Sequence, residues 1–236
     1  MIGILGGMGP EATNDLYKKI IKNTDAKKDQ DHIHVFIDSN TSIPDRSAYI
    51  NGNGEDPRPE MIKSLLRLEV AGAKYVAIPC NTAHYFYDDL KKCTNINIIN
   101  MIAETAKTIR SEYPDCFKLL LLATTGTYNS GIYKKVFEVH GLEIIEPSNL
   151  DKEIVMKWIY DYKSGKSSVK KEEFEKLIEV YSYEKTEMSV SSGPLQMPVI
   201  LGCTEIPLIA ELINAKGNFV DPTMILAKKC VELGKQ

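Results

Sequence analysis

The sequence predicts an α/β protein with two similar, doubly wound domains whose sheets are mostly parallel. Short apolar runs alternate with segments of helical spacing along the chain, which is the pattern of repeated β-α-β units. Runs such as 118–122 are continuously apolar, as expected of a strand buried on both faces. The segment ending in Tyr17-Lys-Lys resembles the one ending in Tyr133-Lys-Lys, at an offset far longer than a solenoid repeat. We therefore expect a duplicated domain.

The first half contains the elements of one such domain. Apolar residues that recur every three or four positions predict helices, and short apolar runs predict strands. The polar stretch 39–58 shows neither pattern and is expected to form a long loop. The expected strands are Ile2–Leu5, His34–Asp38 and Tyr75–Ile78, and the expected helices are Glu11–Lys22, Met61–Ala71 and a segment that runs to Leu90.

The second half repeats this alternation. Its expected strands are Lys118–Leu122 and Val199–Leu201, and its expected helices are Ser130–Val139, Asp151–Tyr162 and Lys170–Tyr183. We place an N-terminal α/β domain at residues 1–100 and a C-terminal α/β domain at residues 101–220. A last helix, 221–236, is expected to pack back on the first domain.

Composition narrows the class of protein. The chain of 236 residues is 43% hydrophobic, so it can bury a sizeable core. Its net charge is −3 and it has no long run of basic residues, so its charge pattern does not indicate nucleic-acid binding. No apolar stretch approaches about 18 residues, so we expect no membrane span. Five cysteines without a C-x-x-C pair disfavour a disulfide scaffold and a zinc site. The N-terminus lacks the basic region of a signal peptide, and we expect a cytoplasmic, reduced protein.

Two cysteines occupy matching places in the two halves, each at the end of an apolar run. Cys80 follows the run 75–78, and Cys203 follows the run 199–201. The N–H groups that open a following helix would stabilise a thiolate. Two such thiols facing one pocket would act as base and acid on opposite faces of a substrate carbon. This is the chemistry of a racemase that needs no cofactor.

Polar groups beside the two cysteines could hold a substrate while its α-carbon loses a proton. Asn81, Thr82 and Thr204 directly follow the cysteines, so their side chains can donate to a developing negative charge. The turn 6–10 is rich in glycine and opens a helix, so its N–H groups are expected to offer a carboxylate site.

Each feature also has a plainer interpretation. A cysteine after a strand is more often inert packing than a catalytic group, and the glycine turn matches a dinucleotide loop poorly. His84 could serve as an acid or base, or could simply cap and pack its helix. Lys163 lies at a helix end, where a cation suits the helix dipole. The remaining cysteines are expected to be structural or surface residues, namely Cys93, Cys116 and Cys230.

Three motifs together resemble the aspartate/glutamate racemase superfamily, and most closely its aspartate racemase branch. They are Ile4–Pro10 with Thr13, Pro79–Thr82 with His84, and Leu201–Glu205. The resemblance covers nearly the whole chain. The glutamate racemase branch usually opens with Asp-Ser-Gly-Val-Gly-Gly and has a histidine after its second Cys-Thr pair. This chain has Leu5–Met8 and Glu205 at those places, which disfavours that branch.

The resemblance implies two doubly wound domains related by a pseudo-twofold axis, with the active site between them. It also implies a homodimer and no pyridoxal phosphate, flavin or metal. Cys80 and Cys203 would be the acid/base pair, with Cys203 acting on the L-enantiomer and Cys80 on the D-enantiomer. Arg46 from the long loop and Lys163 would bind the side-chain carboxylate. Further substrate contacts would come from Met8, Asn81, Thr82, Thr124 or Thr125, and Thr204.

We therefore expect cofactor-independent racemisation of an acidic amino acid, with aspartate as the first candidate and no macromolecular partner beyond a second copy. Other enzymes of the same fold stay open, namely a glutamate or broad-specificity racemase, a hydantoin racemase and a maleate isomerase. A non-catalytic amino-acid-binding protein is the alternative of another class, although a binder needs neither thiol. The segment 187–197 departs from the family's approach to the second cysteine and could reshape the pocket.

Overall fold

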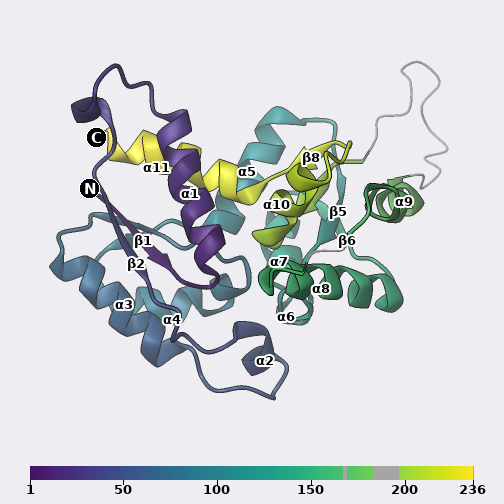
Figure 1. The fold of residues 1–236 in the computed structure, drawn as a ribbon, viewed down its shortest axis with the longest axis horizontal. Helices are drawn as coiled ribbons and strands as arrows, with labels where there is room; N and C mark the ends of the chain where they lie inside the picture. Colours follow the sequence, from purple (N-terminus) through teal and green to yellow (C-terminus); the bar gives the residue numbers. More distant parts are fainter. Residues whose placement is uncertain (167–168, 183–196, 236) are drawn as a thin grey trace.

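The fold consists of two four-stranded parallel sheets with helices around each, as Figure 1 shows. It was obtained as a computed structural model that describes residues 1–166, 169–182 and 197–235. The sheets have the orders β2-β1-β3-β4 and β6-β5-β7-β8, so the same winding occurs twice. The predicted α/β class with two doubly wound units is confirmed. The strands are β1 Ile2–Gly6, β2 Val35–Ser39, β3 Tyr75–Ala77, β4 Asn97–Ile98, β5 Lys118–Leu122, β6 Glu143–Ile145, β7 Val199–Leu201 and β8 Phe219–Val220.

The helices alternate with these strands. In the first half they are α1 Pro10–Asn23, α2 Arg46–Ile50, α3 Arg58–Val70 and α4 Tyr87–Lys91, with the 3-10 helices η1 Asp29–Asp31 and η2 Thr82–Phe86. In the second half they are α5 Met101–Glu112, α6 Thr125–Ser130, α7 Ile132–Val139, α8 Asn149–Lys163, α9 Lys171–Ser182 and α10 Glu205–Leu212, followed by α11 Pro222–Gly234.

Strand β1 shows why this sequence forms a buried central strand. All five of its residues are buried, and alternate side chains point to opposite faces of the sheet. Ile2 and Ile4 pack in one cluster with Leu16 of α1. Leu5 packs in another cluster with Leu65 of α3. Helices on both faces therefore require a continuous apolar strand, as the sequence indicated.

The last helix, α11, returns to the first half of the chain and lies beside α1 (Figure 1). Its residues Leu226 and Cys230 are buried in the same cluster as Ile2 and Leu16. Burial raises the pKa of the Cys230 thiol to about 12, as expected of a packing residue. On this basis we propose an N-terminal domain of residues 1–100, a C-terminal domain of residues 101–220 and a last helical segment, 221–236, that packs on the N-terminal domain.

Several elements were not expected from the sequence. Helix α2 lies inside the predicted loop 39–58, because the Asp45 carboxylate accepts a hydrogen bond from the Ala48 N–H at 2.7 Å and caps the turn. The predicted helix from Ser130 to Val139 is divided by Gly131, whose φ of 64° ends α6. Most of the segment 187–197 lies outside the described residues. No helix in the described part of the chain has the length and apolarity needed to cross a bilayer.

Candidate active site

A closed pocket lies where the two halves meet, at the carboxyl ends of the central strands. Its lining residues are Met8, Asp45, Arg46, Ser47, Cys80, Asn81, Thr82, Thr124, Tyr160, Lys163, Cys203, Thr204 and Glu205. The space left at its centre is about 10 Å³, close to the room of one water molecule. An amino acid can therefore enter only when the surrounding segments move apart.

The two cysteines reach this pocket from corresponding strands. Cys80 follows β3 and Cys203 follows β7, and these strands hold equivalent places in the two sheets. Both thiols are buried. Cys203 precedes α10 as predicted, whereas Cys80 is followed by the 3-10 helix η2. The fold thus delivers one thiol from each half to the same small cavity.

Cys203 has an acidic neighbour that sequence reasoning did not assign to the site. Its Sγ donates a hydrogen bond to Oε2 of Glu205 at 2.9 Å. The other carboxylate oxygen, Oε1, pairs with Nζ of Lys163 at 3.6 Å. Burial, and then the charge of Glu205, raises the pKa of Cys203 well above its ordinary value. Cys203 is therefore protonated in this state.

Lys163 remains charged although it is largely surrounded by protein. Burial, the largest effect, would by itself lower its pKa, but the acidic groups that face it, Glu205 first among them, together outweigh burial, so the pKa is raised. The predicted anchor for a substrate carboxylate is thus already paired with a carboxylate of the chain.

Arg46 presents an unbalanced positive charge to the pocket. Its Nη1 donates to the Pro44 carbonyl at 2.9 Å, and its Nη2 donates to the Met8 carbonyl at 3.1 Å. Its buried Nε has no hydrogen-bond partner. Among the described residues, no carboxylate lies within ion-pair distance of the guanidinium group. A buried Arg with a free donor and only carbonyl partners is suited to receiving an anion.

Asn81 supplies a second free donor. Its Oδ1 accepts a hydrogen bond from the Tyr133 hydroxyl at 2.5 Å, which fixes the orientation of the amide. Its buried Nδ2 has no partner. Because buried polar groups are normally hydrogen-bonded, an unpaired donor in a pocket indicates a place for a ligand acceptor.

A cluster of hydroxyl groups forms one wall of the pocket and joins the halves. Thr82 of the first half lies 3.0 Å from Thr124 and 2.9 Å from Thr127 of the second half, measured between Oγ1 atoms. Ser47 of α2 donates from its Oγ to Thr124 Oγ1 at 3.2 Å. Thr124 also caps α6 through the Thr127 N–H. Hydroxyls of this kind can rotate to donate to a substrate carboxylate.

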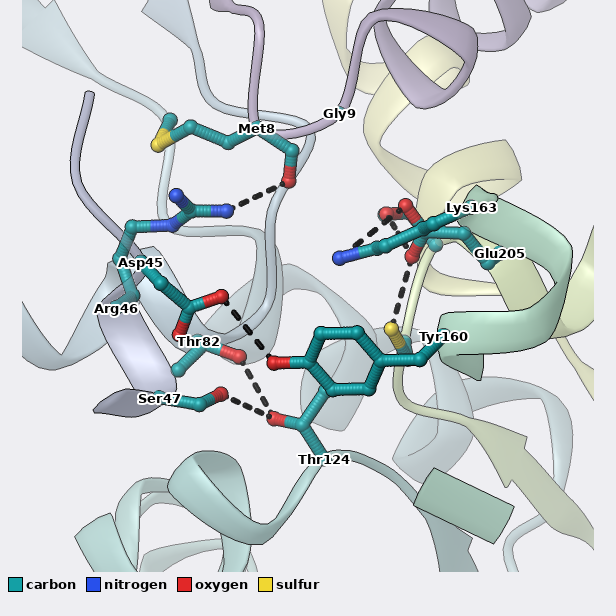
Figure 2. Close-up of polar contacts among 12 residues, drawn as sticks. Met8, Gly9, Asp45, Arg46, Ser47, Thr82, Thr124, Tyr160, Lys163 and Glu205 are labelled. Atoms are coloured by element: carbon teal, nitrogen blue, oxygen red, sulfur yellow. Dashed lines mark hydrogen bonds and ion pairs between the residues drawn. The ribbon is translucent and has the colours of Figure 1, made fainter. Parts of the chain in front are cut away.

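The segment around α2 holds the pocket shut. The Tyr160 hydroxyl of α8 donates to Oδ2 of Asp45 at 3.2 Å, across the boundary between the halves (Figure 2). Gly126 of α6 allows close contact with α2, since a Cβ there would lie 2.6 Å from the Ser47 Cα. These contacts explain the small volume of the cavity.

The structure brings together nine of the ten predicted site residues. Thr125 is the exception, because it does not line the pocket and its Oγ1 accepts from Asn51 at 3.2 Å. Asp45, Ser47, Tyr160 and Glu205 also line the pocket but were not assigned by sequence reasoning. Glu205 had a usable signal, its place directly after Cys-Thr. Asp45 and Tyr160 had none, since they meet only in the folded protein.

Two other predicted features have structural roles. His84 is buried, and its Nε2 accepts from the Met101 N–H at 3.1 Å. Its Nδ1 therefore carries the proton and donates to the Cys80 carbonyl at 2.9 Å. Burial lowers its pKa, so it is neutral. In the glycine turn, the Gly7 N–H is taken by Thr13 Oγ1 at 2.9 Å and is not free for a substrate. The described residues include no group of three or more His, Cys, Asp or Glu that could hold a metal.

The profile of the Asp/Glu/hydantoin racemase family matches residues 5–230. The chain belongs to this racemase family. A broad specificity amino-acid racemase of Bacillus subtilis (strain 168), named RacX, is 33% identical over 151 residues. That match covers 61% of this chain and 63% of the relative, so it spans less than two thirds of the relative's length.

Solved structures of the racemase family share the whole fold. An aspartate racemase of Picrophilus torridus has a TM-score of 0.82 at 29% identity, over 99% of this chain and 94% of its own. An aspartate racemase homologue of Pyrococcus horikoshii OT3 has a TM-score of 0.76 at 30% identity, over 100% and 99%. A glutamate racemase of Francisella tularensis, solved with D-glutamate, is 19% identical with a TM-score of 0.64, which shows the fold alone. The predicted family membership is confirmed.

Proposed function

We propose that this chain is a cofactor-independent racemase of acidic amino acids and that aspartate is its preferred substrate. One observation carries the proposal: Cys80 and Cys203 come from opposite halves and line the same closed pocket. A proton can then be removed from one face of an α-carbon and returned to the other by two thiols. Membership of the racemase family and the likeness to an aspartate racemase support this assignment.

The reaction needs one thiolate and one thiol at a time. In the L to D direction, the thiolate of Cys203 takes the α-proton and the thiol of Cys80 gives a proton to the opposite face. The α-carbon is planar in the carbanion and receives its new proton on the opposite face inside the closed pocket, so the two cysteines exchange protonation states. The reverse reaction begins with the Cys80 thiolate. We assign the enantiomers to the cysteines by the pattern of the family.

The free donors of the pocket support a substrate with two carboxylates. The Nε of Arg46 and the Nδ2 of Asn81 are both buried and unpaired, so each can bind one carboxylate oxygen. The hydroxyls of Thr82 and Thr124 lie beside Asn81 in the lining and can complete the α-carboxylate site. Arg46 would then hold the side-chain carboxylate. Lys163 would add charge when Glu205 releases it.

Closure of the pocket is part of the proposed mechanism. A site with room for about one water excludes bulk solvent, and electrostatic interactions inside it are stronger than in water. The Asp45–Tyr160 hydrogen bond and the Ser47–Thr124 hydrogen bond would open to admit substrate and close over it. We further propose that the protein is a homodimer. Light scattering of the purified protein measures the molar mass that tests this proposal.

The deciding experiment is α-proton exchange in D₂O without added cofactor. L-aspartate and L-glutamate are incubated with the enzyme. The products are separated by chiral chromatography, and their deuterium content is measured by mass spectrometry. Appearance of deuterated D-aspartate, faster than D-glutamate, is the expected result. Binding of aspartate without exchange would favour an amino-acid-binding protein, and inactivity towards both acids would sink the proposed racemisation of acidic amino acids.

A broad-specificity amino-acid racemase is the second candidate. The relative from Bacillus subtilis bears that description, and Lys163 is already neutralised by Glu205, so the pocket does not demand two substrate carboxylates. A panel of neutral and basic amino acids in the same exchange assay separates the two candidates. Aspartate should react fastest if Arg46 selects the substrate, whereas similar rates across the panel would favour the broad enzyme.

A further inference from the structure

Glu205 is buried between the groups that would perform the proposed chemistry. Its side chain is 3% exposed, and its two oxygens have different partners. Oε2 accepts from Cys203 Sγ at 2.9 Å and from Thr204 Oγ1 at 3.3 Å, while Oε1 faces Lys163 Nζ at 3.6 Å. A buried carboxylate is costly unless it is paired, and this one is paired with a proton donor and a cation.

The starts of two helices border the carboxylate. Glu205 is the first residue of α10 and only Thr204 separates it from Cys203, so the start of the helix turns its side chain back to the thiol. Gly9, the residue before α1, borders the carboxylate on the other side, where a Cβ would be in ordinary contact with Oε1 at 3.6 Å. The short distance from Glu205 to Cys203 is therefore imposed by the fold.

Cys203 needs a proton acceptor if it is to act as a base. In this state it is a thiol that donates its hydrogen bond to Glu205. The pocket has room for about one water, so bulk solvent has little access once it is closed. We propose that Glu205 accepts the proton of Cys203 to generate the thiolate and returns it when Cys203 must be a thiol. This role rests on the proposed racemase function.

The substrate itself would drive this transfer through Lys163. A substrate carboxylate that pairs with Lys163 takes the counter-ion away from Glu205 and leaves it buried as a lone anion. A buried carboxylate without a counter-ion binds a proton more strongly. The step is balanced: the S–H bond of Cys203 breaks, an O–H bond forms on Glu205, and the total charge does not change. The thiolate then takes the α-proton.

Net racemisation rates cannot test which thiol is affected, because the equilibrium constant between enantiomers is one. The ratio of kcat/KM in the two directions is then fixed at one for every variant. The rate at which deuterium enters the recovered starting enantiomer is not constrained by this ratio. Each thiol exchanges the α-proton of the enantiomer whose proton it faces. The Cys203→Ala variant identifies the enantiomer that depends on Cys203, and Cys80→Ala identifies the other.

The test compares Glu205→Gln with these references in D₂O. Glutamine keeps the shape of the side chain but cannot take the proton. Exchange of the enantiomer that depends on Cys203 should fall about 100-fold, as expected for loss of a general base, while exchange through Cys80 persists. Persistence on the Cys80 side also shows that the variant is folded. Glu205→Asp, which keeps a carboxylate, should recover part of the lost exchange.

The possible outcomes separate the inference from the function on which it rests. Wild-type protein that exchanges neither enantiomer would reject the racemase proposal itself. An active wild type together with equal losses on both sides in Glu205→Gln would show a structural role and overturn the inference. Unchanged or faster exchange on the Cys203 side would also overturn it, since loss of the negative charge alone favours the thiolate.

Discussion

Replacing Tyr133 by phenylalanine tests whether the amide of Asn81 is held in place for a ligand. The Tyr133 hydroxyl is buried and donates to Asn81 Oδ1 at 2.5 Å. Without it, Oδ1 becomes a buried acceptor with no donor, which costs about 1–3 kcal/mol. For a chain of this length that loss lowers Tm by about 2–12 °C. Phenylalanine leaves the packing unchanged, so no cavity adds to the cost.

The same substitution should lower activity. The freed amide can rotate, so Nδ2 no longer points reliably towards the substrate carboxylate. If the loss of transition-state stabilisation equals the loss of folding stability, about 1–3 kcal/mol, kcat/KM for aspartate falls by a factor of about 5 to 150. The assays are a thermal melt and steady-state racemisation followed by chiral chromatography.

Tyr128→Phe is the matched control. Tyr128 is also buried, but its hydroxyl bonds to the backbone of Leu121 and Ala123, and the side chain does not line the pocket. It should lose stability at least as much as Tyr133→Phe while the KM for aspartate stays near that of the wild type. Equal kinetic losses in both variants, or an unchanged Tyr133→Phe enzyme, would refute the role assigned to Tyr133.

Four further predictions concern the pocket and its thiols. Cys80→Ala and Cys203→Ala should each abolish complete racemisation in the chiral assay, and wild-type turnover in either would end the two-base scheme. Arg46→Ala should raise the KM for aspartate about 10- to 100-fold, since a hydrogen bond to a charged group contributes about 1.5–3 kcal/mol; an unchanged KM would remove it from the site. Gly126→Ala should raise the KM as well, because the added Cβ pushes α2 away; an unaltered KM would mean that α2 is not part of the closure. Burial, and then the Glu205 charge, raise the pKa of Cys203. Cys203 should therefore remain a thiol at pH 8 and should ionise to the thiolate only at higher pH. Mass spectrometry should therefore find Cys93 alkylated long before Cys203, and the opposite order would contradict that shift.

The positions of the two cysteines could be predicted because they depend on local patterns. Each follows a buried strand, and the carboxyl ends of parallel strands meet at one edge of a sheet. The choice between Thr124 and Thr125 could not be made in this way. Adjacent residues at a helix start point in different directions, and only the folded structure shows that Thr124 caps α6 towards the pocket.

The parts that sequence reasoning missed depend on short elements or on contacts between the halves. Strands β4 and β8 have two residues each, too few to show a period. The Asp45–Tyr160 contact joins segments 115 residues apart, so no local pattern indicates it. Glu205 was visible in the motif, but its ion pair with Lys163 joins α10 to α8, and no local pattern indicates that contact.

The imidazole of His84 provides an internal spectroscopic reporter for the first thiol. The chain has four histidines, and His32, His34 and His140 are not buried. His84 is held as the single tautomer with its proton on Nδ1, between the carbonyl of Cys80 and the N–H of Met101. Met101 begins α5, where the chain passes into its second half. The ¹⁵N resonances of this ring therefore register, without any label at the active site, whether substrate binding shifts the Cys80 loop relative to that crossing.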